Sequence, residues 1–270
     1  MVVTEMEDSR AIDRAERPER IMYSMRALGR AGLPEDFELD GIRYRLWRSV
    51  KHDFVAATGF YHDDQGRKVV LKISRTVSFA CVPLHWMGRW ACRREMHFYR
   101  RLSDLPNVPR LLGQVGATGF VHEYVEGRPL SADRPVPDGF FQQLQELLAQ
   151  LHRRNIAYVD TNKPQNILLG EDGRPHLIDF QISLDLACVS RWAWGRWLLR
   201  LAAREDFYHI LKHKRRLRPD ELSDEERAAS RRKSPIIRLH RFLFKPYFFV
   251  RRRLFRHLRA TGRLLPEGSK

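Results

Sequence analysis

The sequence predicts an α+β fold, and three observations carry this prediction. Short runs of apolar and β-branched residues fill the stretch 37–74, as strands do. Two later segments, 86–102 and 140–153, repeat apolar residues at helical spacing. A hairpin of two apolar runs joined by a polar, Gly-containing turn occupies 166–180. Strands gathered early and helices gathered later are typical of this fold class.

The amino-terminal residues 1–36 mix both charge signs and show no strand pattern. Apolar side chains recur at helical spacing around 21–28, so we predict one amphipathic helix within an N-terminal extension. The first residues are charged throughout, unlike a secretory signal.

The stretch 37–74 predicts an antiparallel meander. Its three strand-like runs are 42–47, 54–61 and 68–73, and a polar turn separates the last two. Lys72 stands in the third run. The helix predicted at 86–102 has a strongly basic face on which Glu95 is the one acid.

The middle of the chain predicts two more strands, 107–113 and 119–125, and then a Pro-rich joint. Asp138 is placed to cap the helix 140–153, since Asp is a preferred N-cap residue. Apolar side chains recur along that helix every three or four residues, which predicts a buried face.

Four polar residues gather at the mouth of the hairpin: Asp160, Lys163, Asn166 and Asp179. Alone, each has an ordinary explanation, such as capping a turn or ending a strand. Together they supply two carboxylates, an amide and an ammonium. Such a set can position a hydroxyl and hold a hard cation against phosphate oxygens, so the joint pattern favours a functional site.

This region resembles the catalytic loop and metal-binding segment of the protein-kinase-like superfamily. The chain reads Ala-Tyr-Val-Asp at 157–160, then Asn166, then Asp-Phe-Gln at 179–181. Within the superfamily it is most similar to the bacterial lipopolysaccharide kinases, which phosphorylate core sugars. The resemblance implies two lobes: a small antiparallel β lobe with one helix at 37–128, and a mainly helical large lobe at 129–235.

The resemblance also implies a role for each residue at the mouth of the hairpin. Asp160 would orient or deprotonate the acceptor hydroxyl, and Lys163 would balance charge on the transferred phosphoryl group. Asn166 and Asp179 would hold Mg²⁺ bridging the phosphates of ATP.

A nucleotide site follows from the same resemblance. Lys72 would grip the inner phosphates and Glu95 would pair with it. The segment around Glu123 and Val125 resembles the hinge between lobes, whose backbone would bond the adenine edge. The implied cofactors are therefore ATP and Mg²⁺.

The chain departs from the common pattern in several places. Asn166 lies six residues after Asp160, one more than usual, and Tyr158 stands where His is common. Gln181 replaces a Gly that would allow unusual backbone dihedrals, so we expect a less mobile metal segment. The chain has no Gly-rich phosphate loop and no Ala-Pro-Glu after the hairpin, which argues against a conventional protein-substrate cleft.

Charge is concentrated at the carboxyl end. Residues 191–270 hold 23 Lys and Arg against 8 Asp and Glu, so they carry +15 of the net +16. Such a charge suggests an anionic partner. The basic amphipathic segment 236–270 fits an anionic membrane surface or lipopolysaccharide, and equally a helix packed on the large lobe. Nucleic acid is the least favoured partner, because no signature of a nucleic-acid-binding fold is present.

A long helix is predicted around 192–201, where three Trp and several Leu suggest the buried spine of the large lobe. Three cysteines without metal-ligand spacing predict free thiols in a reducing cytoplasm. No apolar run approaches the roughly 20 residues that span a bilayer. We expect a cytoplasmic protein that is either soluble or peripheral on the inner face of the cytoplasmic membrane.

The expected activity is ATP-dependent phosphoryl transfer to a hydroxyl, with a sugar of lipopolysaccharide or another small molecule as acceptor. Two alternatives stay open. One is a Ser/Thr protein kinase, and the other is a pseudokinase that binds nucleotide or a membrane partner without catalysis.

Overall fold

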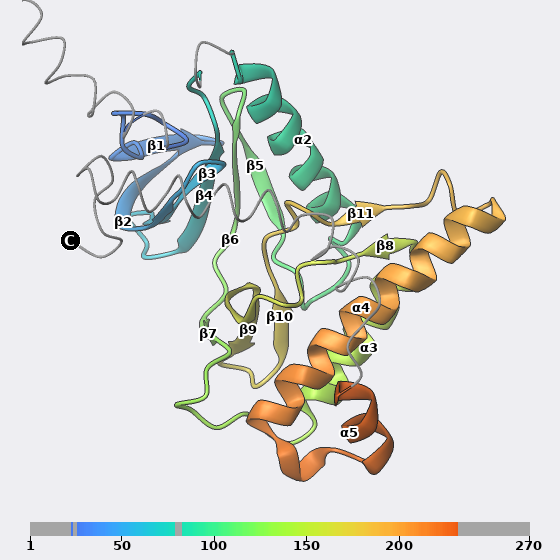
Figure 1. The fold of residues 1–270 in the computed structure, drawn as a ribbon. Helices are drawn as coiled ribbons and strands as arrows, with labels where there is room; N and C mark the ends of the chain where they lie inside the picture. Colours follow the sequence, from blue (N-terminus) through green and yellow to red (C-terminus); the bar gives the residue numbers. More distant parts are fainter. Residues whose placement is uncertain (1–22, 24–25, 79–82, 232–270) are drawn as a thin grey trace, which may run out of the picture. The chain divides into compact units, whose positions relative to one another are not determined.

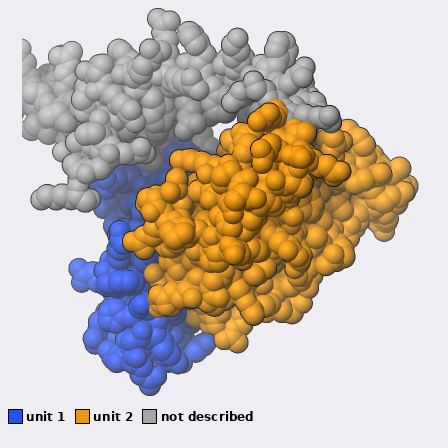
Figure 2. Space-filling view, turned by 90° about the horizontal axis from the view of Figure 1, so that it is seen from below, with its two compact units in different colours: residues 1–92, 113–121, 238–270 blue, residues 93–112, 122–237 orange. Residues whose placement is uncertain are grey.

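The computed structural model describes residue 23 and residues 26–78 and 83–231. Residues 21, 22, 24 and 25 of the predicted amino-terminal helix, and the whole basic segment 236–270, lie outside these residues. The chain divides into two compact units (Figure 2). Unit 1 comprises residues 1–92, 113–121 and 238–270, and unit 2 comprises 93–112 and 122–237. The predicted domain boundaries at 36, 128 and 235 stay predictions.

A six-stranded sheet is the main element of unit 1 (Figure 1). Its order is β1-β2-β3-β4-β6-β5, and the first four strands pair antiparallel. The strands are β1 (Asp36–Leu39), β2 (Ile42–His52), β3 (Ala56–His62), β4 (Lys68–Ser74), β5 (Leu111–Val115) and β6 (Gly119–Glu123). The predicted meander is therefore confirmed.

Alternating side chains on one face of this sheet form its core. Phe37 stacks on Tyr44 with ring centroids 5.2 Å apart, and Tyr61 meets Phe37 edge-on at 4.9 Å. Val69, Leu71 and Val121 complete the buried cluster. Removal of this aromatic and branched surface from water is the main stabilising term for the sheet.

Helix α2 (His85–Arg101) confirms the predicted basic helix, and the division between the units falls within it. In unit 2, helix α3 (Phe140–Arg153) buries its apolar face, as its helical spacing predicts. Helix α4 (Ala193–Leu217) packs on α3, and α5 (Asp224–Arg231) packs on α4 (Figure 1).

Short strands in unit 2 carry the loops of interest. The hairpin of β9 (Ile167–Gly170) and β10 (Pro175–Leu177) is close to the predicted one, and β7 (Gly127–Pro129) joins its edge. Strands β8 (Ile156–Ala157) and β11 (Leu184–Asp185) pair antiparallel. Two 3₁₀ turns cover Pro164–Asn166 and Pro219–Glu221.

Two expectations about these helices are wrong. The N-cap residue of α3 is Gly139, with a φ of +72° that glycine adopts readily, and it makes no side-chain cap bond. Asp138 instead forms an ion pair with Arg218 at 2.7 Å. The three tryptophans at the start of α4 are exposed rather than buried.

Among the described residues, no helix combines the length and apolar character that a bilayer crossing requires.

Candidate active site

The structure brings Asp160, Lys163 and Asn166 together in unit 2. Lys163 Nζ donates to Asp160 Oδ2 at 2.8 Å, and Asn166 Nδ2 donates to the same oxygen at 2.6 Å. The 3₁₀ turn between them folds the six-residue spacing into one compact loop. Asp160 is buried, whereas the Lys163 side chain is half exposed.

Burial raises the pKa of Asp160, and the nearby Asp179 carboxylate acts in the same direction. The hydrogen bonds and charge from Lys163 and Asn166 oppose this shift, but the net pKa is above the ordinary value. A buried carboxylate that binds a proton more readily than usual is suited to accept one from a hydroxyl.

A residue that the sequence reasoning missed holds this loop in place. Asp206 of α4 is fully buried. It accepts hydrogen bonds from the backbone N–H groups of Tyr158 (3.0 Å) and Val159 (2.8 Å), and from the Thr161 hydroxyl (3.2 Å). His152 Nε2 lies 3.0 Å from Asp206 Oδ2, the oxygen that also accepts from Tyr158. The sequence signal was a lone pair of acids, Glu205 and Asp206, inside an otherwise apolar and basic helix.

The anchoring matters because the loop backbone is strained. Val159 has a φ of +68°, in a region that β-branched residues rarely adopt. Such a conformation costs of order 1–3 kcal/mol and persists only where its surroundings hold it. The bond from Val159 N–H to Asp206 is part of that hold. Residues near active sites often carry strain of this kind.

The peptide before Asp179 is held on both sides by tyrosine hydroxyls. The Tyr158 hydroxyl donates to the Ile178 carbonyl, and the Asp179 N–H donates to the Tyr99 hydroxyl at 3.3 Å. Burial raises the pKa of both phenols well above the ordinary value, which keeps them neutral. This pair of bonds fixes the peptide plane from which Asp179, itself at a φ of +65°, projects.

Phe180 packs between the same two rings. Its centroid lies 5.2 Å from that of Tyr99 and 5.3 Å from that of Tyr158, both edge-on. Phe98 stacks on its remaining face at 6.2 Å. The aromatic cluster therefore locks the residue beside Asp179 within the core of unit 2.

Basic side chains of α2 hold the segment that follows Phe180. The Arg94 guanidinium donates to the carbonyls of Gln181 and Ser183. Asp185 accepts from Arg101 at 2.6 Å and lies 2.8 Å from His97 Nε2. Burial acts to raise the pKa of Asp185, but these hydrogen bonds bring it below its usual range. The predicted low mobility of this segment stays a prediction.

The remaining predicted site residues are spread over both units. Lys72 is buried in β4 of unit 1, where it pairs with Thr58 across the sheet. Glu95 is buried on the part of α2 that belongs to unit 2. The predicted pairing of Lys72 with Glu95 would join the two units and stays a prediction.

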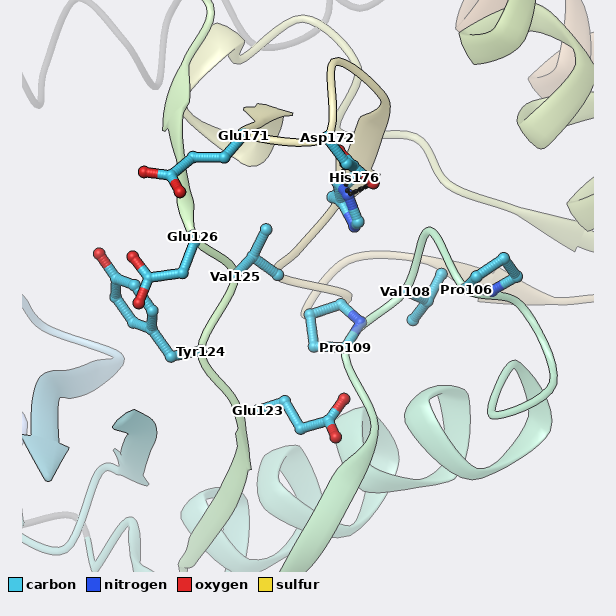
Figure 3. Close-up of a pocket in the computed structure, with 10 residues that line it drawn as sticks. All are labelled: Pro106, Val108, Pro109, Glu123, Tyr124, Val125, Glu126, Glu171, Asp172 and His176. Atoms are coloured by element: carbon cyan, nitrogen blue, oxygen red, sulfur yellow. Dashed lines mark hydrogen bonds and ion pairs between the residues drawn. The ribbon is translucent and has the colours of Figure 1, made fainter. Parts of the chain in front are cut away.

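Glu123 ends β6 and Val125 lies two residues beyond it, and both line a pocket of about 290 Å³ (Figure 3). Arg110 Nε donates to the Glu123 carboxylate at 2.8 Å, so that side chain is engaged. Glu126, Glu171 and Asp172 also line the pocket. Four carboxylates would repel phosphate, so this pocket is not where the phosphates of a nucleotide fit.

The polar residues at this site in unit 2 suit a magnesium ion whose remaining ligands come from phosphate. No cluster of three or more His, Cys, Asp or Glu suited to a metal exists among the described residues. Mg²⁺ in nucleotide sites commonly takes one or two protein oxygens and completes its shell with phosphate and water. Asn166 and Asp179 would supply those protein oxygens.

Comparison with known proteins identifies the fold. No family model matches the chain. The Rio2 kinase of Chaetomium thermophilum, solved as an ADP/Mg²⁺-phosphoaspartate complex, superposes with a TM-score of 0.50 at 20% identity. The match covers 68% of this chain and 60% of that one. A second structure of the same kinase gives a TM-score of 0.49 at 20% identity over 68% of this chain and 62% of that one. The chain has a protein-kinase-like fold.

A curated relative is also a kinase. The serine/threonine-protein kinase UCN of Arabidopsis thaliana is 34% identical over 140 residues, which is 46% of this chain and 30% of that protein. The chain thus spans less than a third of the length of this relative and 60% of the Rio2 kinase chain. The predicted kinase-like fold is confirmed. The closer similarity to lipopolysaccharide kinases stays a prediction.

Proposed function

We propose that the chain is an ATP-dependent phosphotransferase with a hydroxyl acceptor. The observation that carries the proposal is the cluster of Asp160, Lys163 and Asn166 within 2.8 Å contacts, on a loop anchored by buried Asp206. The kinase-like fold and the ADP/Mg²⁺ complex of the Rio2 kinase support it.

The chain's own groups would divide the work. The Asp160 carboxylate accepts the proton of the acceptor hydroxyl while that oxygen bonds to the γ-phosphorus and the bond to ADP breaks. The Lys163 ammonium, held beside Asp160, stabilises negative charge on the transferred group. Asn166 and Asp179 orient Mg²⁺, which when bound would offset the charge of the phosphate oxygens.

The acceptor that we propose is a sugar of a lipopolysaccharide-like glycolipid or another small molecule. The absence of Ala-Pro-Glu after the hairpin supports a small acceptor over a protein. The net charge of +16 fits an anionic glycolipid and a place on the cytoplasmic face of the membrane.

A Ser/Thr protein kinase is the second candidate, and the similarity to the plant kinase UCN favours it. Both candidates require Mg²⁺-dependent loss of the γ-phosphate of ATP, which the Asp179→Ala substitution should abolish. Purified chain is supplied with labelled ATP and with sugar, glycolipid or protein acceptors. Transfer to protein alone would favour the second candidate. Transfer that persists in Asp179→Ala would refute the assigned site.

A further inference from the structure

The amino-terminal end of α4 exposes three tryptophans. Trp192, Trp194 and Trp197 have exposed fractions of 58%, 58% and 60%. Figure 1 shows this end of the helix extending past β8 and β11 of the same unit. Tryptophans usually bury most of their surface, so three exposed within six residues of the chain suggest a partner.

This end of the helix packs closely against the loop that precedes it. A Cβ on Gly195 would lie 1.9 Å from the Val189 carbonyl oxygen, so only glycine lets the helix approach that loop. The Trp192 N–H donates to the same carbonyl at 3.0 Å, and the Ser190 N–H donates to Leu186 O at 2.8 Å. The segment that carries the tryptophans is therefore packed against the loop that precedes it.

The charge around the tryptophans is entirely positive. Arg191, Arg196 and Arg200 are exposed among them, and no Asp or Glu occurs from residue 186 to 204. Two of these side chains turn back to the backbone: Arg196 donates to Arg191 O at 3.1 Å and Arg200 to Arg196 O at 3.2 Å. We call the six residues, three Trp and three Arg, the Trp–Arg surface.

We propose that the Trp–Arg surface binds the interface of an anionic phospholipid bilayer. Indole rings favour the headgroup level of a membrane, where an apolar body and a polar N–H are both accommodated. Arginine adds attraction to anionic headgroups. A second copy of the chain is a poorer occupant, because it would bring three arginines against the same three.

The surface is distinct from the site in unit 2 but mechanically linked to it. Trp194 and Asp206 lie on one helix, twelve residues apart, which corresponds to about 18 Å along the axis. Asp206 anchors the catalytic loop. Membrane contact at the tryptophans would therefore fix the distance of that loop from the lipid surface. The proposal does not depend on catalysis and is tested without it.

The experiment measures co-sedimentation of the full chain with phosphatidylcholine vesicles that either contain or lack phosphatidylglycerol. The Trp194→Ser/Trp197→Ser variant should bind phosphatidylglycerol vesicles about tenfold or more weakly than wild type, because two large apolar side chains no longer insert. Trp47→Ser is the matched control, since Trp47 is also exposed, at 51%, but lies on β2. It should bind as wild type does.

A further variant, Arg196→Gln/Arg200→Gln, should weaken binding to the anionic vesicles several-fold and make it less sensitive to salt. Unchanged thermal midpoints show that each variant is folded. Equal binding by wild type and the tryptophan variant would overturn the proposal, as would equal binding to both vesicle types. The proposal would also be overturned if wild type did not bind vesicles but did self-associate or bind an oligonucleotide, and if the tryptophan variant lost that interaction.

Discussion

At the scale of single residues, the peptide between Ile178 and Asp179 is the most tightly specified part of the site. Its carbonyl accepts from Tyr158 and its N–H donates to Tyr99, and both rings are fully buried. The two hydroxyls act on one peptide plane, so each helps to aim the Asp179 carboxylate. These tyrosines thus act as positioning residues for Asp179, the proposed metal ligand.

The Tyr99→Phe substitution removes one of these bonds without changing the packing of the ring. A neutral hydrogen bond contributes about 0.5–1.5 kcal/mol, so we expect the Mg²⁺ concentration for half-maximal rate to rise about two- to tenfold. Initial rates over a Mg²⁺ series measure it. Tyr61→Phe is the control, because Tyr61 is also buried and donates to a backbone carbonyl, that of Pro34. An unchanged Mg²⁺ dependence in Tyr99→Phe would contradict the role.

The raised pKa of Asp160 predicts the acid side of the pH–rate profile. The base must be ionised, so kcat/KM should fall as the pH drops through a value above the ordinary aspartate pKa. Lys163 acts to lower that pKa. In Lys163→Met the pKa should rise further, and the acid limb should move to higher pH in addition to any loss of rate. An acid limb that stays in place or moves to lower pH would argue against Asp160 as the base.

The sequence could predict the residues that make up this site but not what holds them. Asp160, Asn166 and Asp179 stand in an order that resembles a known pattern, and the structure brings Asp160 and Asn166 together. Asp206 lies 46 positions beyond Asp160 on a helix without comparable spacing. Its role depends on tertiary contact, which local patterns do not encode.

At the scale of elements, α4 links the candidate site to the rest of unit 2. Its midpoint anchors the catalytic loop through Asp206. Its carboxyl-terminal end binds α5, where Lys214 Nζ donates to Glu226 at 2.8 Å. Its amino-terminal end carries the Trp–Arg surface. One helix therefore contacts the loop of the candidate site, packs on α5 and carries the surface proposed to bind membrane.

The Asp206→Ala substitution should destabilise unit 2 strongly. It leaves the backbone N–H groups of Tyr158 and Val159 and the Thr161 hydroxyl without their acceptor, and each hydrogen bond to a charged group contributes about 1.5–3 kcal/mol. Because local relaxation recovers part of this, we expect a loss of about 2–5 kcal/mol in urea unfolding.

Arg204→Gln, at an exposed position of the same helix, is the control and should change stability by about 0.5 kcal/mol or less. A loss in Asp206→Ala no larger than that of the control would show that the loop is held by other contacts.

The elements were more predictable than their ends and environments. The strands β2 to β4 and helices α2 and α3 follow from periodicity, which is a local property. The cap of α3 could not be foreseen, because Gly139 adopts a left-handed conformation and frees Asp138 for Arg218. The tryptophans of α4 were predicted to be buried because bulky apolar residues are usually buried. Their exposure depends on what packs against that end of the helix.

At the scale of the whole molecule, the predicted nucleotide contacts draw on both units. Lys72 belongs to unit 1, whereas Asn166 and Asp179 belong to unit 2. A nucleotide that binds the folded chain would stabilise it by mass action. That linkage separates a working nucleotide site from a kinase-like scaffold without one.

ATP with Mg²⁺ should therefore raise the thermal midpoint of the wild-type chain. A ligand at a hundred times its Kd adds about 2.7 kcal/mol to the free energy of unfolding. In Asp179→Ala the part of the shift that depends on Mg²⁺ should disappear, and in Lys72→Met the shift should shrink with or without metal, since a phosphate contact is lost.

Lys51→Met is the matched control for the lysine, because Lys51 pairs with Asp53 at the surface of the same sheet. Its shift should equal that of wild type. A normal shift without γ-phosphate loss to any acceptor would favour the pseudokinase. No shift in wild type would refute the nucleotide site itself, whereas a full metal-dependent shift in Asp179→Ala would move the metal ligand to another residue.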